Sequence, residues 1–222
     1  MGAIRVLTFD CDGVLFDTEA ANKAFYNQIL AYFNRPPMSE EQFAHAQMHT
    51  VDAAIANLFP DPAEYEKAQQ YRKETGYTPF IPYMQMDPDL VGLLEKYRES
   101  LHLAVATNRS DTMGKVLEIH GIAHYFDLVV TALDVNRPKP DPEQLNRALS
   151  HFKQPPGAML YVGDSLLDAR AAEAAGVWFA ACRNPELSAH FHIERLSELA
   201  SILSRPPFSA PSVQGAESGN GV

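Results

Sequence analysis

The residues Ile4-Arg5-Val6-Leu7-Thr8-Phe9-Asp10-Cys11-Asp12-Gly13 decide the fold of this chain. Their apolar, β-rich first part predicts a buried strand, which ends in two carboxylates and a glycine. Residues two apart on an extended backbone point the same way, so Asp10 and Asp12 can address one reacting centre, while Gly13 permits a sharp turn. At the carboxyl edge of an open α/β sheet, one acid could attack as a nucleophile and the other could move protons. The alternative interpretation is a strand that runs into an acidic, solvated turn.

Five β-like segments, counting the first, alternate with helical patterns along most of the chain. The predicted strands are residues 5–9, 102–107, 128–131, 159–162 and 177–181. The predicted helices are residues 89–100, 111–120, 142–152, 166–175 and 193–203. This alternation is typical of an α/β fold with a doubly wound, Rossmann-like parallel sheet covered by helices on both faces.

One long stretch departs from this alternation and predicts an inserted domain. Residues 18–78 show apolar and aromatic residues at helical spacing and no convincing strand, and Pro36-Pro37 and Pro60 divide them into separate helices. We therefore expect a core of residues 1–15 and 84–203 and a helical insert of residues 16–83. Residues 204–222 are rich in Pro, Ser, Gly and Ala, a composition that predicts a disordered tail.

Composition narrows the possible partners and the compartment. The formal net charge of −10 over 222 residues argues against nucleic acid or an anionic membrane as the main partner. No apolar stretch approaches the roughly 20 residues of a membrane-spanning helix. The two cysteines form no C-x-x-C motif, which fits a reducing compartment. The sequence therefore predicts a cytoplasmic protein.

The second predicted strand ends in hydrogen-bond donors. Thr107, Asn108 and Arg109 supply a hydroxyl, an amide and a guanidinium, which suit phosphoryl oxygens. Ser110 is a candidate cap for the helix that follows, whose first amides also favour an anion. The alternative for Thr107 is a strand-end hydroxyl bonded to the backbone.

A third motif places Lys139 between Pro138 and Pro140. Each proline fixes its own φ and restricts the residue before it, so the lysine backbone is held at low entropic cost. Asp141 then predicts a helix N-cap with Pro142 at the first helical position. A lysine on this rigid loop can neutralise both a phosphate and a nucleophilic carboxylate; the alternative is an ordinary surface lysine.

The fourth motif is again strand, glycine and acid, in Gly163-Asp164-Ser165-Leu166-Leu167-Asp168. Asp164 and Asp168 lie about one helical turn apart, so both can face the same cavity. Several carboxylates converging on a phosphate would repel it unless a cation lay between them, and hard oxygen ligands in that number select Mg²⁺. The alternative is a helix N-cap at Asp164 with a solvated Asp168.

These four motifs, in this order from about Ile4 to about Leu203, resemble those of the haloacid dehalogenase-like superfamily. The similarity is greatest to the branch of phosphoglycolate phosphatases and β-phosphoglucomutases. The resemblance implies that the helical insert is a cap. It also implies that Asp10 attacks phosphorus, and that Asp12 protonates the leaving oxygen and then helps to activate water.

The resemblance also implies roles for the remaining motif residues. Thr107, Asn108 and Lys139 would hold the phosphoryl oxygens, and Arg109 stands where phosphoglycolate phosphatases have a lysine. The implied ligands of Mg²⁺ are Asp10, the backbone carbonyl of Asp12 and Asp164, with Asp168 in support.

The sequence thus predicts a Mg²⁺-dependent phosphatase that hydrolyses a small phosphomonoester through an aspartyl-phosphate intermediate. Its partner would be a small phosphorylated metabolite, and the protein would be a monomer or a small homo-oligomer. The alternatives are a phosphomutase of the β-phosphoglucomutase type and a non-catalytic phospho-ligand-binding protein. The acid at position 12 disfavours a dehalogenase.

The predicted cap bears on these alternatives. Residues 36–66 contain no Lys or Arg, which argues against a mutase, because a mutase must hold a second phosphate. It also favours neutral over anionic leaving groups. His45 and His49 lie one helical turn apart, and we interpret them as solvated or cap-lining residues rather than metal ligands.

Overall fold

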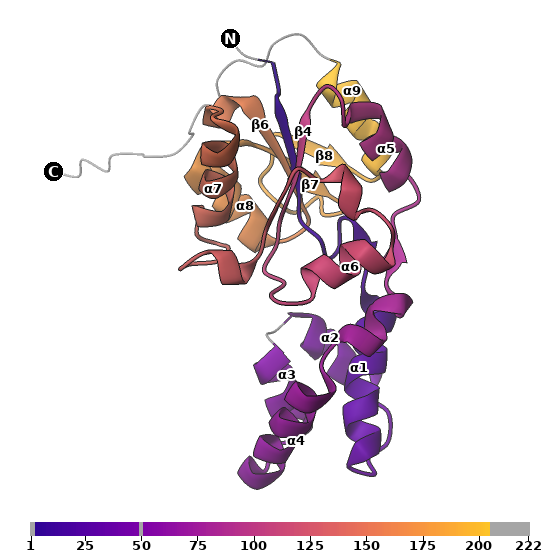
Figure 1. Cartoon of the computed structure of the whole chain (residues 1–222). Coiled ribbons are helices and arrows are strands. Elements are labelled where there is room, and N and C mark those ends of the chain that lie inside the picture. The colour runs from indigo at the N-terminus through magenta and orange to yellow at the C-terminus, as the bar shows by residue number, and fades with distance from the viewer. Residues whose placement is uncertain (1–2, 49–50, 205–222) are drawn as a thin grey trace, which may run out of the picture. The chain divides into compact units, whose positions relative to one another are not determined.

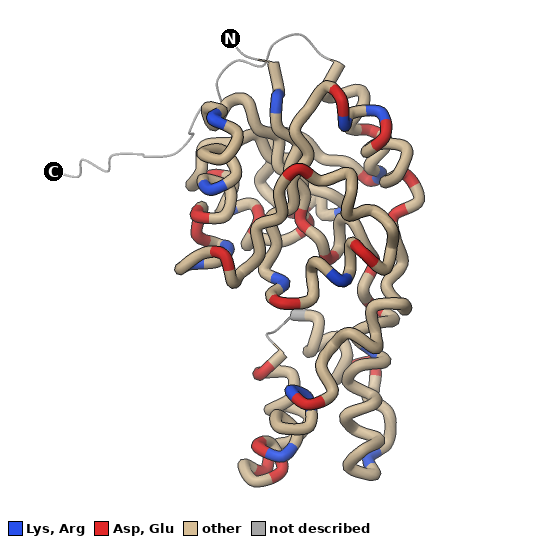
Figure 2. Tube along the Cα trace, viewed as in Figure 1, with Lys and Arg blue, Asp and Glu red and all other residues tan. Residues whose placement is uncertain are grey.

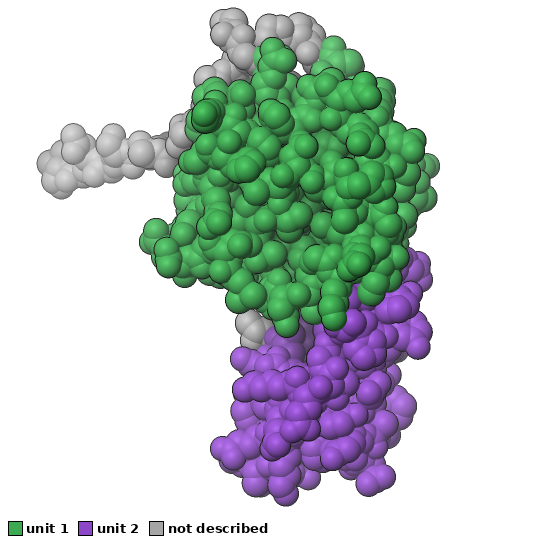
Figure 3. All heavy atoms as spheres, viewed as in Figure 1, with its two compact units in different colours: residues 1–16, 86–222 green, residues 17–85 purple. Residues whose placement is uncertain are grey.

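The computed structural model describes residues 3–48 and 51–204 of the chain. It divides into two compact units (Figure 3), of which unit 1 comprises Met1–Phe16 and Met86–Val222 and unit 2 comprises Asp17–Gln85. The expected boundaries were 15/16 and 83/84. The predicted tail lies outside the described residues from position 205 onward.

Unit 1 is built on a parallel sheet with the strand order β5-β4-β1-β6-β7-β8. The strands are β1 (Val6–Phe9), β4 (His102–Ala106), β5 (Leu128–Val130), β6 (Met159–Gly163), β7 (Trp178–Cys182) and β8 (Phe191–Ile193). The helices are α5 (Leu90–Tyr97), α6 (Met113–Ile119), α7 (Glu143–Phe152), α8 (Leu166–Ala175) and α9 (Leu199–Leu203). Figure 1 shows α7 and α8 along one face of the sheet and α5, α6 and α9 along the other. The predicted doubly wound α/β fold is confirmed.

The first strand lies in the middle of this sheet, and both of its faces are buried. Residues of β1 are fully buried, with Leu7 and Phe9 on one face and Val6 on the other, where it packs with α7 and α8. Its neighbours are β4, where Phe9 pairs with Val105, and β6, where Phe9 pairs with Val162. Three strands therefore end side by side, and each is followed by one of the polar motifs. Strands β4 and β6 lie on opposite sides of β1. Open sheets of this type bind ligands at the carboxyl ends of the strands, at the point where the strand order reverses in this way.

The carboxyl-terminal part of unit 1 differs from the expectation. Residues 193–203 were predicted as one helix, but the chain forms the sixth strand β8, a 3-10 helix at Leu196–Glu198 and then the short helix α9. Strand β8 exists because it pairs with β7, with Phe191 opposite Ala180. Only Ile193 of the predicted helix lies in β8, and the parallel sheet has one strand more than the five predicted.

Unit 2 is helical, and two of the breaks between its α-helices fall at the proline boundaries read from the sequence, Pro36-Pro37 between α1 and α2 and Pro60 between α3 and α4. They are α1 (Glu19–Tyr32), α2 (Glu40–Met48), α3 (Val51–Leu58) and α4 (Pro62–Thr75), followed by a 3-10 helix at Thr78–Tyr83. Phe25 of α1 packs edge-on against Phe80, with ring centroids 5.4 Å apart. Asp61 caps α4, accepting bonds from the amides of Ala63 and Glu64 at 3.0 Å.

The strands β2 (Phe16–Asp17) and β3 (Gln85–Met86) pair where the chain passes between the units. Unit 2 carries basic residues beyond residues 36–66. Helix α4 carries charges of both signs (Figure 2), and its Arg72 lies 3.1 Å from Asp52 at the start of α3.

No helix in the described ranges is long and apolar enough to cross a membrane.

Candidate active site

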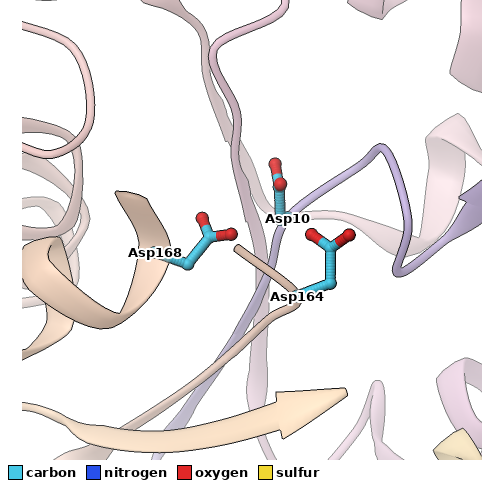
Figure 4. A group of neighbouring side chains, drawn as sticks. All are labelled: Asp10, Asp164 and Asp168. Carbon is cyan, nitrogen blue, oxygen red and sulfur yellow. The ribbon is translucent and has the colours of Figure 1, made fainter. Parts of the chain in front are cut away.

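Three carboxylates meet at the carboxyl ends of β1 and β6. Asp10 follows β1, Asp164 follows β6, and Asp168 lies in the first turn of α8; Figure 4 shows their side chains around a common space. One oxygen from each lies within 4.8 Å of the others. Gly13, with a φ of 76°, lets the loop pass so close that a Cβ there would be 1.9 Å from Asp164 Oδ2. The first and the fourth motif are therefore brought together in one site.

Lys139 is the cation of this cluster. Its side chain is only 2% exposed, and its Nζ lies 2.8 Å from Asp10 Oδ1 and 2.6 Å from Asp168 Oδ1. The alternative of an ordinary surface lysine is thus wrong. Helix α7 begins one residue later than predicted, with Pro142 at the N-cap, although Asp141 Oδ1 still accepts a bond from the Glu143 amide at 3.1 Å.

Asn108 of the second motif holds the backbone of Lys139. The side-chain amide of Asn108 donates to the Lys139 carbonyl at 2.9 Å and accepts from the Lys139 amide at 3.1 Å. Thr107 is buried, and its Oγ1 accepts a bond from the Arg109 amide at 3.1 Å, which is the backbone contact of the alternative interpretation. Helix α6 has Thr112 at its N-cap, so the expectation that Ser110 caps it was wrong; Ser110 instead bonds to Asp111.

Asp168 is held by protein donors on both of its oxygens. Oδ1 accepts from Lys139 and from the Tyr161 hydroxyl, each at 2.6 Å, and Oδ2 accepts from the Ser165 amide at 3.0 Å. Ser165 is the N-cap of α8 in a capping box with Asp168. The alternative of an N-cap at Asp164 with a solvated Asp168 is therefore wrong, since Asp168 is fully buried.

Burial and Lys139 together determine the pKa values of the cluster. Burial raises the pKa of Asp10 to about 7, because Lys139 offsets only part of the desolvation. Burial and the charge of Asp168 raise the pKa of Asp164 to about 7. Burial also opposes ionisation of Asp168, but Lys139, Ser165 and Tyr161 outweigh it and hold the pKa of Asp168 below its usual value. Burial would lower the pKa of Lys139, but Asp10 and Asp168 raise it above its usual value, so the lysine is charged.

Arg109 and Asp12 form a two-pronged ion pair beside the cluster. Arg109 Nε donates to Asp12 Oδ2 at 3.0 Å, and Arg109 Nη2 donates to Asp12 Oδ1 at 2.6 Å. Fork-to-fork pairs of this kind are strong and directional. Arg109 thus binds both carboxylate oxygens of Asp12. Arg109 was expected to bind substrate and Asp12 to act as the general acid, but in this structure the two side chains bind each other.

The donor set fits Mg²⁺. Asp164 makes no side-chain hydrogen bond to another residue in the described part of the chain, and the pKa values near 7 of Asp10 and Asp164 show carboxylates that a cation would stabilise in their ionised form. Hard oxygen ligands are those that Mg²⁺ prefers. Asp168 is committed to Lys139, Tyr161 and Ser165, which suits a supporting position rather than direct ligation.

Sequence reasoning missed three residues that organise this site. They are Tyr161, whose hydroxyl contacts Lys139 at 3.0 Å, Gln144, whose Nε2 donates to the Thr107 carbonyl at 2.7 Å, and Ser165. A polar hydroxyl inside the apolar run Met159–Gly163 was a signal for Tyr161. No comparable signal marked Gln144, which is buried on α7. His49 lies outside the described residues.

Comparisons with known proteins identify the family of this chain. The family model of haloacid dehalogenase-like hydrolases matches residues 7–182. The phosphoglycolate phosphatase of Vibrio cholerae is 30% identical over 192 residues, covering 80% of this chain and 84% of that protein. The pyrophosphatase PpaX of Bacillus velezensis is 30% identical over 188 residues, covering 78% and 80%. The crystal structure of a HAD-superfamily hydrolase of subfamily IA from Geobacter sulfurreducens has a TM-score of 0.86 and 38% identity, covering 91% of this chain and 97% of that one.

The chain therefore belongs to the haloacid dehalogenase-like hydrolase family. Its named relatives are phosphatases. They confirm two predictions, the enzyme class of phosphoric monoester hydrolases and the phosphoglycolate phosphatase branch of the family.

Proposed function

We propose that this protein is a Mg²⁺-dependent phosphatase that hydrolyses a small phosphomonoester through an aspartyl-phosphate intermediate. The observation that carries the proposal is the cluster itself, in which Asp10 lies 2.8 Å from the buried ammonium of Lys139 and shares a common space with Asp164. A nucleophilic carboxylate beside a fixed cation, at the carboxyl edge of a parallel sheet, suits attack on a phosphoryl group.

The proposed reaction has two steps. A carboxylate oxygen of Asp10 forms a bond to phosphorus while the bond from phosphorus to the leaving oxygen breaks, and Asp12, once released from Arg109 and protonated, gives that oxygen a proton. In the second step Asp12 takes a proton from water, the water oxygen forms a bond to phosphorus, and the bond from phosphorus to the Asp10 oxygen breaks, which releases phosphate and the free carboxylate of Asp10. Mg²⁺, held by Asp10, Asp164 and the Asp12 carbonyl, would supply charge stabilisation for the phosphoryl oxygens. Lys139 neutralises charge beside Asp10, while Asp168 and Tyr161 fix the lysine.

The ion pair of Arg109 bears on the substrate. Asp12 already balances the charge of Arg109, so a substrate carboxylate would have to displace Asp12 in order to bind the guanidinium. In unit 2, Asp52 likewise pairs with Arg72. These pairings support the expectation that monophosphates of neutral small molecules are preferred over anionic ones. The relatives include phosphoglycolate phosphatases, and phosphoglycolate carries a carboxylate besides its phosphate. A preference for neutral substrates and a preference for phosphoglycolate therefore make opposite predictions.

Two experiments test this proposal. A phosphate-release screen over phosphorylated metabolites with Mg²⁺ present identifies the substrate, and Asp10→Asn should abolish release because an amide does not attack phosphorus. Substantial turnover in Asp10→Asn would exclude the covalent mechanism. Phosphoglycolate against a neutral alkyl phosphate of similar size, in wild type and Arg109→Ala, tests specificity. A strong wild-type preference for the carboxylate that disappears in Arg109→Ala would restore phosphoglycolate as the leading substrate.

We also propose that unit 2 acts as the specificity cap and that the enzyme works in the cytoplasm. The helical composition of unit 2 and its insertion directly after the first strand support the first of these. The two cysteines, Cys11 and Cys182, are both free thiols, which suits a reducing compartment and supports the second.

A further inference from the structure

Arg183 and Asn184 follow β7 directly and belong to none of the four motifs. Arg183 has a φ of 56°, in the left-handed region that residues with a side chain seldom adopt. A backbone conformation of this kind persists where surrounding contacts hold it. The contacts of Arg183 therefore indicate what this turn does.

The guanidinium of Arg183 bridges two segments that are far apart in the sequence. Its NH1 donates to Asp87 Oδ2 at 2.8 Å. Its NH2 donates to the carbonyl oxygens of Gly13 at 3.1 Å and Val14 at 3.0 Å. We call this group, Arg183 with Asp87 and the carbonyls of Gly13 and Val14, the linker clamp. One planar side chain thus holds a carboxylate and two backbone groups, which a lysine cannot reproduce.

Asp87 is a buried acid, and every part of it is engaged. Its residue is 7% exposed, its Oδ1 accepts from the Asp89 amide at 2.9 Å, and its own amide donates to the Leu15 carbonyl at 2.9 Å. Unit 1 ends its first segment at Phe16 and resumes at Met86. The linker clamp therefore fastens unit 1 at the two places where the chain leaves and re-enters it.

The same contacts reach the carboxylate cluster. Gly13 packs so closely on Asp164 that a Cβ would lie 1.9 Å from Asp164 Oδ2. On the other side, Asn184 Nδ2 donates to the Asp164 carbonyl at 2.8 Å. The adjacent residues Arg183 and Asn184 thus hold both the loop that packs against Asp164 and the backbone that carries it.

We propose that Arg183, through the linker clamp, is a positioning residue that holds the Gly13 loop against Asp164 and so sets how Asp10 and Asp164 are presented to Mg²⁺. This role rests on the proposed function, since it concerns the same site. Groups that orient ligands without touching the metal typically change metal affinity or activity by about 10- to 100-fold when they are removed.

The test compares Arg183→Gln with wild type in the full-length protein. Titration calorimetry with Mg²⁺ alone should show about tenfold weaker binding in Arg183→Gln. Hydrogen exchange should become faster at the amides of Gly13 and Asp87, whose bonds to Phe16 and Leu15 the clamp supports. With a phosphomonoester at saturating Mg²⁺, kcat should fall while KM stays within about twofold, because no clamp residue is placed on the substrate.

Arg195→Gln is the matched control. Arg195 makes a comparable ion pair with Asp89, at 2.9 Å, on the same segment that re-enters unit 1, and it makes no contact with Gly13 or Asp164 among the described residues. Its removal should leave Mg²⁺ affinity within about twofold of wild type. If Arg183→Gln does not fold, Arg183→Lys takes its place; it keeps the charge, cannot hold all three acceptors, and should still bind Mg²⁺ several-fold more weakly.

Unchanged Mg²⁺ affinity in the folded Arg183 variant would overturn the proposal, and so would an equal loss in Arg195→Gln, because the effect would then be general loosening. An active wild type whose Mg²⁺ affinity does not depend on Arg183 refutes the linker clamp alone. A wild type whose Mg²⁺ affinity depends on Arg183 but which releases no phosphate refutes the proposed function alone.

Discussion

Asp10→Asn should make the metal-free protein more stable while it removes activity. Burial raises the pKa of Asp10 from 3.8 to about 7, so the ionised form is unfavourable in the folded state. Each pKa unit corresponds to about 1.4 kcal/mol, which gives a destabilisation of about 4 kcal/mol above neutral pH. The amide has no charge to desolvate, so Asp10→Asn should recover up to about that amount.

The pH dependence gives the sign of this effect. Between pH values near 3.8 and 7 the folded state binds more protons at Asp10 than the unfolded state, so its contribution to stability falls as the pH rises. The gain from Asp10→Asn should therefore be near its maximum at about pH 8 and shrink to about 1 kcal/mol at about pH 4.5.

The assay is urea unfolding in EDTA at both pH values. The matched control is Asp111→Asn, an exposed carboxylate whose contact with the Ser110 hydroxyl an asparagine can keep; it should change stability little at either pH. A gain that is absent at the higher pH, or equal at the two pH values, would refute the electrostatic reasoning.

Four further predictions concern the same site. Tyr161→Phe should lower kcat about tenfold with KM little changed, because Lys139 and Asp168 lose a hydroxyl at 3.0 and 2.6 Å; unchanged steady-state kinetics would contradict the positioning role. Asp12→Ala should slow formation of the intermediate less for an aryl phosphate than for an alkyl phosphate, since only the poorer leaving group needs the proton; equal losses in rapid-quench measurements would argue against Asp12 as the acid. EDTA should stop phosphate release, Mg²⁺ should restore it and Ca²⁺ should not, because Ca²⁺ coordinates at longer and more variable distances; full activity after exhaustive chelation would exclude the metal. Gly163→Ala should lower the unfolding free energy by about 1–3 kcal/mol, because its Cβ would lie 2.4 Å from Asp168 Cβ; an unchanged thermal midpoint would show that the site tolerates the methyl group.

The sequence predicted well the parts of the structure that depend on local chemistry. The apolar runs before Asp10 and Asp164 are long enough and uniform enough to be buried strands, and the acids that follow them had to lie at a strand end. Because β1 and β6 are parallel neighbours, both acids lie at the same edge of the sheet. The same reasoning missed β8, whose three residues form a strand only because β7 is beside them.

By itself, the sequence determined the α/β class, the presence of a helical insert after the first strand, the prolines that divide that insert, and the acids and the lysine that form the cluster. These features follow from periodicity and residue type over a few consecutive positions. Only the tertiary structure decided the partners of the charged groups. It paired Arg109 with Asp12, 97 residues away, and Arg183 with Asp87, 96 residues away. The physical reason is that the partner of a long, flexible cation depends on sheet register and loop path, and these are fixed only when the whole core packs.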